Sequence, residues 1–161
     1  MFKESFSEHL FSLGEFLSPE KCQELIDFSE KEGYERAKVN AMGGQVEMLT
    51  VRNNYRCLWH SEEFAEVLWL SLKDQVVKQL GFSEAVGLNE LLRFYKYEPG
   101  QKFKEHIDGS YEAPNGDTSY FTFMVYLNDD FEGGETSLNA SQIQKQLLAP
   151  YKAAVKENIG A

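Results

Sequence analysis

The spacing of apolar residues predicts helices in the first half of the chain. Residues 17–34, LSPEKCQELIDFSEKEGY, begin with a capping serine and a proline suited to the first helical position, and Gly33 suits the end. Residues 61–82, SEEFAEVLWLSLKDQVVKQLGF, predict a second helix capped by Ser61 and ended by Gly81. The two stripes at helical spacing consist of Cys22, Leu25, Ile26 and Ser29, and of Phe64, Leu68, Leu72 and Val76.

From residue 88 the period becomes two, which is typical of strands. Strands are predicted in residues 89–98, 101–111 and 119–129, with turns at Pro99-Gly100 and at EAPNGDT, residues 112–118. The segment SYFTFMVYLND, residues 119–129, has bulky side chains on both faces, so both faces should be covered, as in a barrel or sandwich. A turn and a short strand in DDFEGGETSL end this pattern near Leu138.

Two other segments have different patterns. Residues 38–59 contain strand-forming pieces around Gly43-Gly44, which predicts extended structure with an exposed loop. Residues 139–161 return to a helical period, and we expect Pro150, which lacks a backbone N–H, to kink or divide that helix. The apolar residues of this tail are Ile143, Leu147, Tyr151, Val155 and Ile159.

Helices followed by a run of strands predict an α+β fold in which the helices back a β-barrel. We expect a single domain over residues 1–161. It divides into a helical support region (14–87), a β region (88–138) and an atypical helical tail (139–161).

Composition narrows the function classes. The formal charge of −10 repels phosphate backbones, so we expect no nucleic-acid partner and favour a basic or neutral substrate. Cys22 and Cys57 stand 35 residues apart without a CxxC pairing, which indicates reduced thiols and a cytoplasmic location. We expect neither a signal peptide nor a membrane span, and oligomeric state is left open.

The segment FKEHIDGSYE, residues 103–112, carries the candidate chemistry. His106 and Asp108 are two residues apart, so on a strand both side chains point to one side. An imidazole and a carboxylate side by side suit Fe(II), Mn(II) or Zn(II), and one more histidine would complete a 2-His-1-carboxylate site. The same spacing also occurs in ordinary ion-paired surface residues, and the pair alone does not decide between the two.

Several longer pieces occur in a characteristic order: RFYKYEPGQKFKEHID, then FTFMVYLND, then GGET, preceded by FLSPEKCQELI and VRNNYRCLW. Together they resemble the iron(II)/2-oxoglutarate-dependent dioxygenases, and within them the prolyl 4-hydroxylase-like branch, over roughly residues 14–138. The resemblance implies a double-stranded β-helix (jelly-roll) core, incomplete at its C-terminal end. It also implies hydroxylation of a C–H bond, with succinate and CO2 as co-products and a prolyl residue of a peptide or protein as substrate.

The resemblance also assigns residues. It implies that His106 and Asp108 bind Fe(2+), that Tyr97 meets the 2-oxoglutarate carboxylate, and that L-ascorbate re-reduces the iron. It places three more residues in the co-substrate pocket: Met124, Tyr126 and Thr136. A strand tyrosine is also a common core residue with its hydroxyl at the surface, so Tyr126 has that second interpretation. By composition, residues 40–50 and 110–119 are candidates for a substrate lid.

The chain departs from the family after GGET. There the family has its second iron-binding histidine and a basic residue for 2-oxoglutarate, whereas here no histidine follows His106. His60 and His9 are poor replacements by position. We therefore expect a truncated chain, an alternative ending or a degenerate domain, with little or no turnover from the isolated chain.

Two other functions compete with the dioxygenase. A non-catalytic interaction module would keep the β core and bind a partner through the acidic surface or the tail. A metal-dependent hydrolase would use His106 and Asp108, but no nucleophile motif accompanies them.

Overall fold

The computed structural model describes residues 1–161 apart from 8–9, 42, 138–153, 156–157 and 161. For residues 154–155 and 158–160 the backbone alone is described. Two helices occur in this part of the chain, together with short strands. Neither described helix has the length and apolar character needed to cross a bilayer.

Helix α1 (Pro19–Glu32) begins and ends as its sequence predicts. The Ser18 hydroxyl accepts a hydrogen bond from the Lys21 backbone N–H at 3.2 Å, which satisfies one of the free donors of the first turn. Gly33 follows the last turn with φ of 89°, a conformation that favours glycine. The predicted stripe is confirmed, since Leu25 and Ser29 are the buried residues of this helix.

Helix α2 (Glu62–Leu72) is shorter than predicted. Ser61 caps its start by accepting a hydrogen bond from the Phe64 N–H at 3.1 Å, and Leu68 and Leu72 are buried. The helix was expected to reach Gly81, but residues 79–84 form a hairpin of β7 (Gln79–Leu80) and β8 (Ser83–Glu84). Gly81 is therefore a turn residue, with φ of 61°, rather than a helix end.

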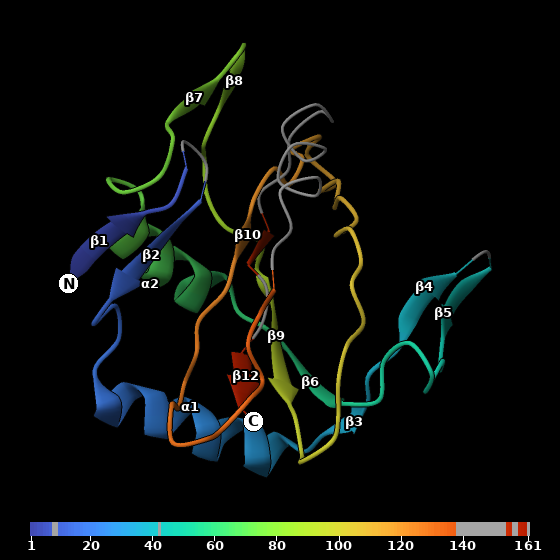
Figure 1. Ribbon diagram of the computed structural model, residues 1–161. Helices are drawn as coiled ribbons and strands as arrows, with labels where there is room; N and C mark the ends of the chain where they lie inside the picture. Colours follow the sequence, from blue (N-terminus) through green and yellow to red (C-terminus); the bar gives the residue numbers. More distant parts are fainter. Residues whose placement is uncertain (8–9, 42, 138–153, 156–157, 161) are drawn as a thin grey trace.

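The largest sheet has four strands in the order β12-β9-β6-β3, with these bounds: β3 (Glu35–Arg36), β6 (Tyr55–His60), β9 (Leu91–Lys96) and β12 (Asn158–Gly160). Strands β6 and β9 pair antiparallel over six residues, and α2 lies between them in the sequence. Strand β12 pairs with β9 in parallel, so β9 has a partner on both sides. Figure 1 shows this sheet in the middle of the molecule, with α1 along its lower end.

Smaller sheets surround this centre. The first is a hairpin of β1 (Phe2–Ser5) and β2 (Phe11–Gly14), and the second a hairpin of β4 (Val39–Ala41) and β5 (Gly44–Val46). The latter confirms the predicted extended pieces around Gly43-Gly44, and it projects from the body of the molecule (Figure 1). Strand β10 (Thr122–Phe123) pairs in parallel with β11 (Ala154–Val155).

The core lies between the helices and one face of the β6–β9 pair. One cluster contains Leu25, Cys57, Phe94 and Leu127, and a second contains Leu68 and Leu92. Aromatic rings link strands to α1: the Phe28 and Trp59 centroids are 4.6 Å apart. The opposite face of β9 holds Tyr95, which is also buried.

Two predictions on the β region and one on the tail are wrong in part. Residues 101–111 are not a strand, because only Phe103 has a β-bridge partner, Arg52. In residues 119–129 only Thr122–Phe123 is a strand, although Phe123, Val125 and Leu127 pack into the core as their alternation predicts. In the tail, residues 154–155 and 158–160 are strands rather than helix, because β10 and β9 offer them backbone partners; the rest of that prediction lies outside the described residues.

The described part is thus α+β, with two helices and several mostly antiparallel sheets, as predicted for its class. The complete jelly roll and the three-part division of the domain stay predictions.

Candidate metal site

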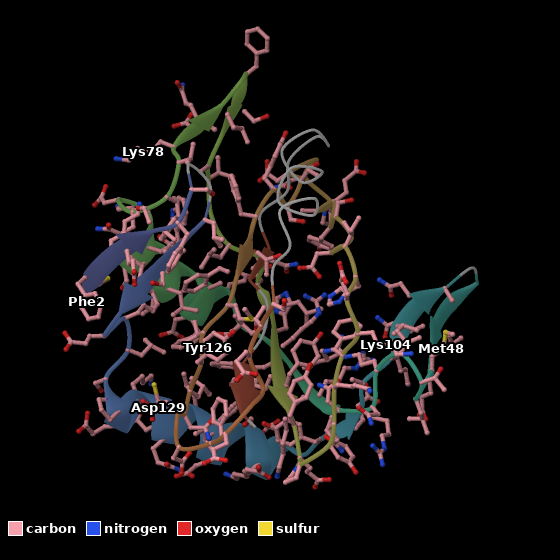
Figure 2. All side chains as sticks on the ribbon, viewed as in Figure 1. Phe2, Met48, Lys78, Lys104, Tyr126 and Asp129 are labelled. Carbon is pink, nitrogen blue, oxygen red and sulfur yellow. The ribbon has the colours of Figure 1, made fainter. Side chains whose placement is uncertain are left out.

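The segment that carries His106 leaves β9 through the Pro99-Gly100 turn, where Gly100 has φ of 82°. It then runs beside residues 51–53. The Lys104 N–H donates to the Val51 carbonyl at 2.9 Å, and the Lys102 N–H donates to Asn53 Oδ1 at 2.7 Å. These contacts hold the segment that Lys104 marks in Figure 2, in place of the sheet partners that a full strand would have.

The backbone fixes the tautomer of His106. Its Nδ1 lies 2.8 Å from the Lys104 carbonyl oxygen, and a carbonyl can only accept, so Nδ1 carries the hydrogen. In the neutral ring Nε2 is then the unprotonated nitrogen, which is the state required of a metal ligand. Nε2 faces Asp108 Oδ1 at 3.3 Å.

Asp108 is oriented by a residue that the sequence did not single out. The Thr122 hydroxyl donates to Asp108 Oδ2 at 2.8 Å, which leaves Oδ1 turned toward His106. Thr122 lies in β10, on the strand face predicted for Met124 and Tyr126. The alternation along residues 119–129 therefore predicts the strand face on which Thr122 lies. It does not predict the hydrogen bond to Asp108, because that contact depends on how the fold brings residues 108 and 122 together.

The contact between Nε2 and Oδ1 sets the chemistry of this pair. With Nδ1 protonated, both facing atoms are acceptors, so either a proton or a cation must lie between them. Two neighbouring ligands that each stand about 2.1 Å from an octahedral metal ion are separated by about 3 Å. The observed 3.3 Å fits that spacing, and the side chains of His106 and Asp108 are 36% and 24% exposed, so an ion can reach them.

A third protein ligand is missing from the described chain. Among these residues there is no group of three His, Cys, Asp or Glu side chains able to hold a metal ion. His60 is at the end of β6, where its Nε2 lies 3.2 Å from Glu90 Oε2, and it takes no part in the pair. His9 lies outside the described residues. His106 and Asp108 thus fit two positions of a 2-His-1-carboxylate site.

The structure brings together two of the four predicted co-substrate residues. The Tyr126 and Thr136 hydroxyls are 2.5 Å apart, and Tyr126 is 44% exposed. Tyr126 is labelled in Figure 2. Tyr97 directly follows β9 and Met124 directly follows β10, and both side chains are half-buried. Their role toward 2-oxoglutarate stays a prediction.

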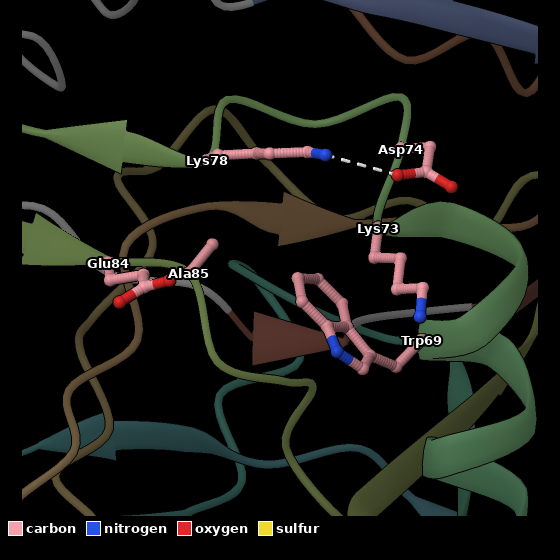
Figure 3. Close-up of a pocket in the computed structure, with 6 residues that line it drawn as sticks. All are labelled: Trp69, Lys73, Asp74, Lys78, Glu84 and Ala85. Carbon is pink, nitrogen blue, oxygen red and sulfur yellow. Dashed lines mark hydrogen bonds and ion pairs between the residues drawn. The ribbon is translucent and has the colours of Figure 1, made fainter.

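A surface hollow of about 340 Å³ lies elsewhere, between the C-terminal end of α2 and the β7–β8 hairpin (Figure 3). It is lined by Trp69, Lys73, Asp74, Lys78, Glu84 and Ala85, and the Lys78 ammonium pairs with Asp74 at 3.1 Å inside it. None of the predicted site residues lines this hollow, so it is separate from the candidate metal site.

The two predicted lid segments differ in character. The β4–β5 hairpin and the residues after it expose apolar side chains, with Met48 42% and Leu49 56% exposed. The other segment closes on itself: Glu112 and Thr118 form a β-bridge, and the Ala113 N–H donates to the Asp117 carbonyl at 2.7 Å. The closed turn in residues 112–118 confirms the predicted loop, and the role of both segments as a lid stays a prediction.

Comparison with known proteins agrees with this geometry. Residues 92–157 match the 2OG-Fe(II) oxygenase superfamily, which extends the resemblance beyond Leu138 into the tail. The chain is 31% identical over 137 residues to Prolyl 4-hydroxylase 1 of Arabidopsis thaliana, covering 82% of this chain and 47% of that protein. It is 24% identical over 140 residues to the PKHD-type hydroxylase PCC7424_1929 of Gloeothece citriformis, covering 84% of this chain and 61% of that protein.

The chain spans about half the length of the plant relatives it matches, including Prolyl 4-hydroxylase 13 of Arabidopsis thaliana, of which it covers 48%. No solved structure matches the chain. The family match begins in β9 and includes His106, Asp108 and Thr122. These matches support a 2OG-Fe(II) oxygenase, prolyl 4-hydroxylase-like, over this segment of the chain.

Proposed function

We propose that this chain provides part of the active site of an iron(II)- and 2-oxoglutarate-dependent dioxygenase that hydroxylates a C–H bond. The contact between His106 Nε2 and Asp108 Oδ1 carries the proposal, because two acceptor atoms at 3.3 Å need a cation between them or a proton on the imidazole. The substrate that the relatives' names favour is a prolyl residue of a peptide or protein, with succinate and CO2 as co-products.

In this proposal the chain's own residues hold and orient the metal. His106 Nε2 and Asp108 Oδ1 are the ligand atoms, the Lys104 carbonyl keeps the imidazole in the required tautomer, and the Thr122 hydroxyl turns the carboxylate. Bound iron would supply the activation of dioxygen by electrons from 2-oxoglutarate, and L-ascorbate would restore Fe(2+) after uncoupled turnovers. Tyr97, Met124, Tyr126 and Thr136 would orient 2-oxoglutarate.

The net charge of −10 favours a neutral or basic peptide over an acidic one. The exposed apolar residues Val46, Met48 and Leu49 suit contact with such a peptide at the β4–β5 hairpin. Cys22 and Cys57 are both free thiols, which supports a cytoplasmic location.

Metal binding tests the proposal directly. We expect the chain to bind Mn(II), which can be measured as the loss of the electron paramagnetic resonance signal of the free ion. The substitutions His106→Ala and Asp108→Asn should each lower the Mn(II) affinity at least about tenfold. His60→Ala is the matched control, because His60 also pairs with a carboxylate, that of Glu90, yet lies outside the site. Equal Mn(II) affinity for the wild type and His106→Ala would rule the site out.

Turnover is a separate question, because no histidine follows His106 and the described residues supply no third ligand. We expect little or no succinate from the isolated chain with Fe(II), 2-oxoglutarate and ascorbate. Robust succinate formation that His106→Ala abolishes would show instead that the 161 residues form a complete site.

The missing third ligand favours one alternative, a non-catalytic interaction module on the same fold. Such a module would show no thermal shift with 2-oxoglutarate in the presence of Mn(II), whereas the dioxygenase should show one. The thermal-shift measurement therefore separates the two functions without requiring turnover.

A further inference from the structure

Arg52 is a buried cation with few polar partners. The residue is 4% exposed, and its Nε donates to Asn54 Oδ1 at 2.8 Å. Its Nη2 is buried without a hydrogen-bond partner in the part of the chain described, and none of the ion pairs found there involves Arg52. A buried charge without a counter-ion is destabilising, so a position like this one calls for a compensating interaction.

Two aromatic rings supply that interaction. The guanidinium carbon lies 3.9 Å from the centroid of Tyr95, a buried residue of β9, and 4.0 Å from the centroid of Phe103. A planar guanidinium can stack on a ring with each of its faces, which an ammonium group cannot do. The backbones of Arg52 and Phe103 also form a β-bridge, so the two residues are joined twice.

The Phe103 ring also stacks on His106, the candidate metal ligand. The Phe103 and His106 ring centroids are 3.6 Å apart with an interplanar angle of 24°. At these distances Arg52 and His106 cannot occupy the same face of the Phe103 ring. Tyr95, Arg52, Phe103 and His106 therefore lie in a continuous four-layer stack, which runs from the central sheet to the candidate metal site.

We propose that Arg52 is a positioning residue for His106. By fixing the plane of the Phe103 ring, it holds the imidazole so that Nε2 stays turned toward Asp108, while the Lys104 carbonyl fixes the tautomer. This assignment accounts for a buried arginine at a position where an apolar residue would serve the core better. Its metal-binding part rests on the proposed function, whereas the stack itself does not.

The first experiment needs no metal. With ¹³C-labelled histidine, the imidazole C–H signals of the chain report three residues, and His106→Ala identifies those of residue 106. Phe103→Leu removes the ring that stacks on His106, so it serves as the reference for a broken stack. The change in chemical shift of the His106 signals in this variant is the displacement with which the other variants are compared. We expect Arg52→Lys, which keeps the charge and the aliphatic stem, to cause at least half of that displacement.

Arg36→Lys is the matched control. Arg36 also stacks on a tyrosine, with its guanidinium carbon 4.3 Å from the Tyr55 centroid, and it also supports the neighbouring backbone through the Asn53 carbonyl at 2.8 Å. It has no contact in the stack, so its replacement should leave the His106 signals in place. His106 signals that stay at their wild-type position in folded Arg52→Lys, or that move equally in Arg36→Lys, would overturn the proposal.

The second experiment measures Mn(II) affinity, and we expect Arg52→Lys to weaken it about tenfold while Arg36→Lys leaves it unchanged. An affinity equal to that of the wild type would overturn the positioning role. If His106→Ala also leaves the affinity unchanged, the proposed metal site fails, and the position of the His106 signals alone then decides whether Arg52 holds the ring.

Discussion

At the scale of single residues, the candidate site depends on groups that do not themselves face the metal. The Lys104 carbonyl and the Thr122 hydroxyl each form one hydrogen bond, at 2.8 Å in both cases, and each determines which atom of its partner is turned toward the other candidate ligand. Such orienting contacts commonly change metal affinity by about 10- to 100-fold when they are lost. The pair predicted from spacing is thus oriented by one neighbour two residues away, Lys104, and by one fourteen residues away, Thr122.

Thr122→Val tests the orienting hydroxyl. Valine keeps the shape of threonine but cannot donate to Asp108 Oδ2, so the carboxylate can rotate, and we expect Mn(II) affinity to fall about tenfold. Thr118→Val, in the closed loop beyond the site, should change nothing. The Mn(II) affinity is measured by titration, with the signal of the free ion as the readout. An affinity of Thr122→Val equal to that of the wild type would show that the hydroxyl is dispensable.

At the scale of elements, Arg56 ties three strands together. From β6 its guanidinium donates to Glu35 Oε1 of β3 at 2.9 Å and to Gln45 Oε1 of β5 at 2.7 Å. The hydrogen bond from Arg56 lowers the pKa of Glu35 from its ordinary value of 4.5. The edge of the central sheet and the β4–β5 hairpin therefore share one charged connection.

This connection has a pH dependence with a defined sign. Because the pKa of Glu35 is lowered in the folded state, its stabilisation is present above pH 4.5 and is lost as the pH falls through the lower folded pKa. We expect Glu35→Gln to reduce the free energy of unfolding at pH 7 by at most about 1 kcal/mol, since Glu35 is half exposed. The difference from the wild type should shrink progressively as the pH falls below 4.5, as measured by urea unfolding; a difference that stays constant with pH would contradict the assignment.

Elements with local signals could be predicted from the sequence, and those that depend on distant partners could not. Ser18 and Ser61 cap their helices because a cap needs only the next turn. Residues 101–111 alternate like a strand, yet the only backbone bridge they form is that of Phe103, because their neighbours are the irregular residues 51–53. The pairing of His106 with Asp108 was predicted from an alternation that the backbone does not follow, and Thr122, Phe103 and Arg52 support the pair in its place.

At the scale of the whole molecule, β9 is the strand that connects the central sheet to the segment of the candidate metal site. It pairs with β6 on one side and with β12 on the other, and its Tyr95 begins the stack that reaches His106. An unpaired strand edge invites association between chains, so the pairing with β12 protects the centre of the sheet.

Deletion of residues 158–161 tests this protection. The loss of β12 removes backbone hydrogen bonds that each contribute about 1 kcal/mol, so we expect a melting temperature lower by about 4 °C or more and concentration-dependent aggregation. Deletion of Ala161 alone is the control, because β12 ends at Gly160. Equal melting temperatures and light scattering for the two truncated chains would show that β9 does not need this partner.

The central unit β6–α2–β9 and the segment 101–111 are held by very different numbers of contacts, so we expect them to open locally at different rates. The unit β6–α2–β9 combines six paired residues with both core clusters, whereas residues 101–111 are held by one bridge, a few hydrogen bonds and the ring of Phe103. Amide hydrogens in β6 and β9 should therefore exchange with solvent only when the whole fold opens, and those around His106 long before. The candidate ligands would then be the part of the chain that a bound metal ion rigidifies most.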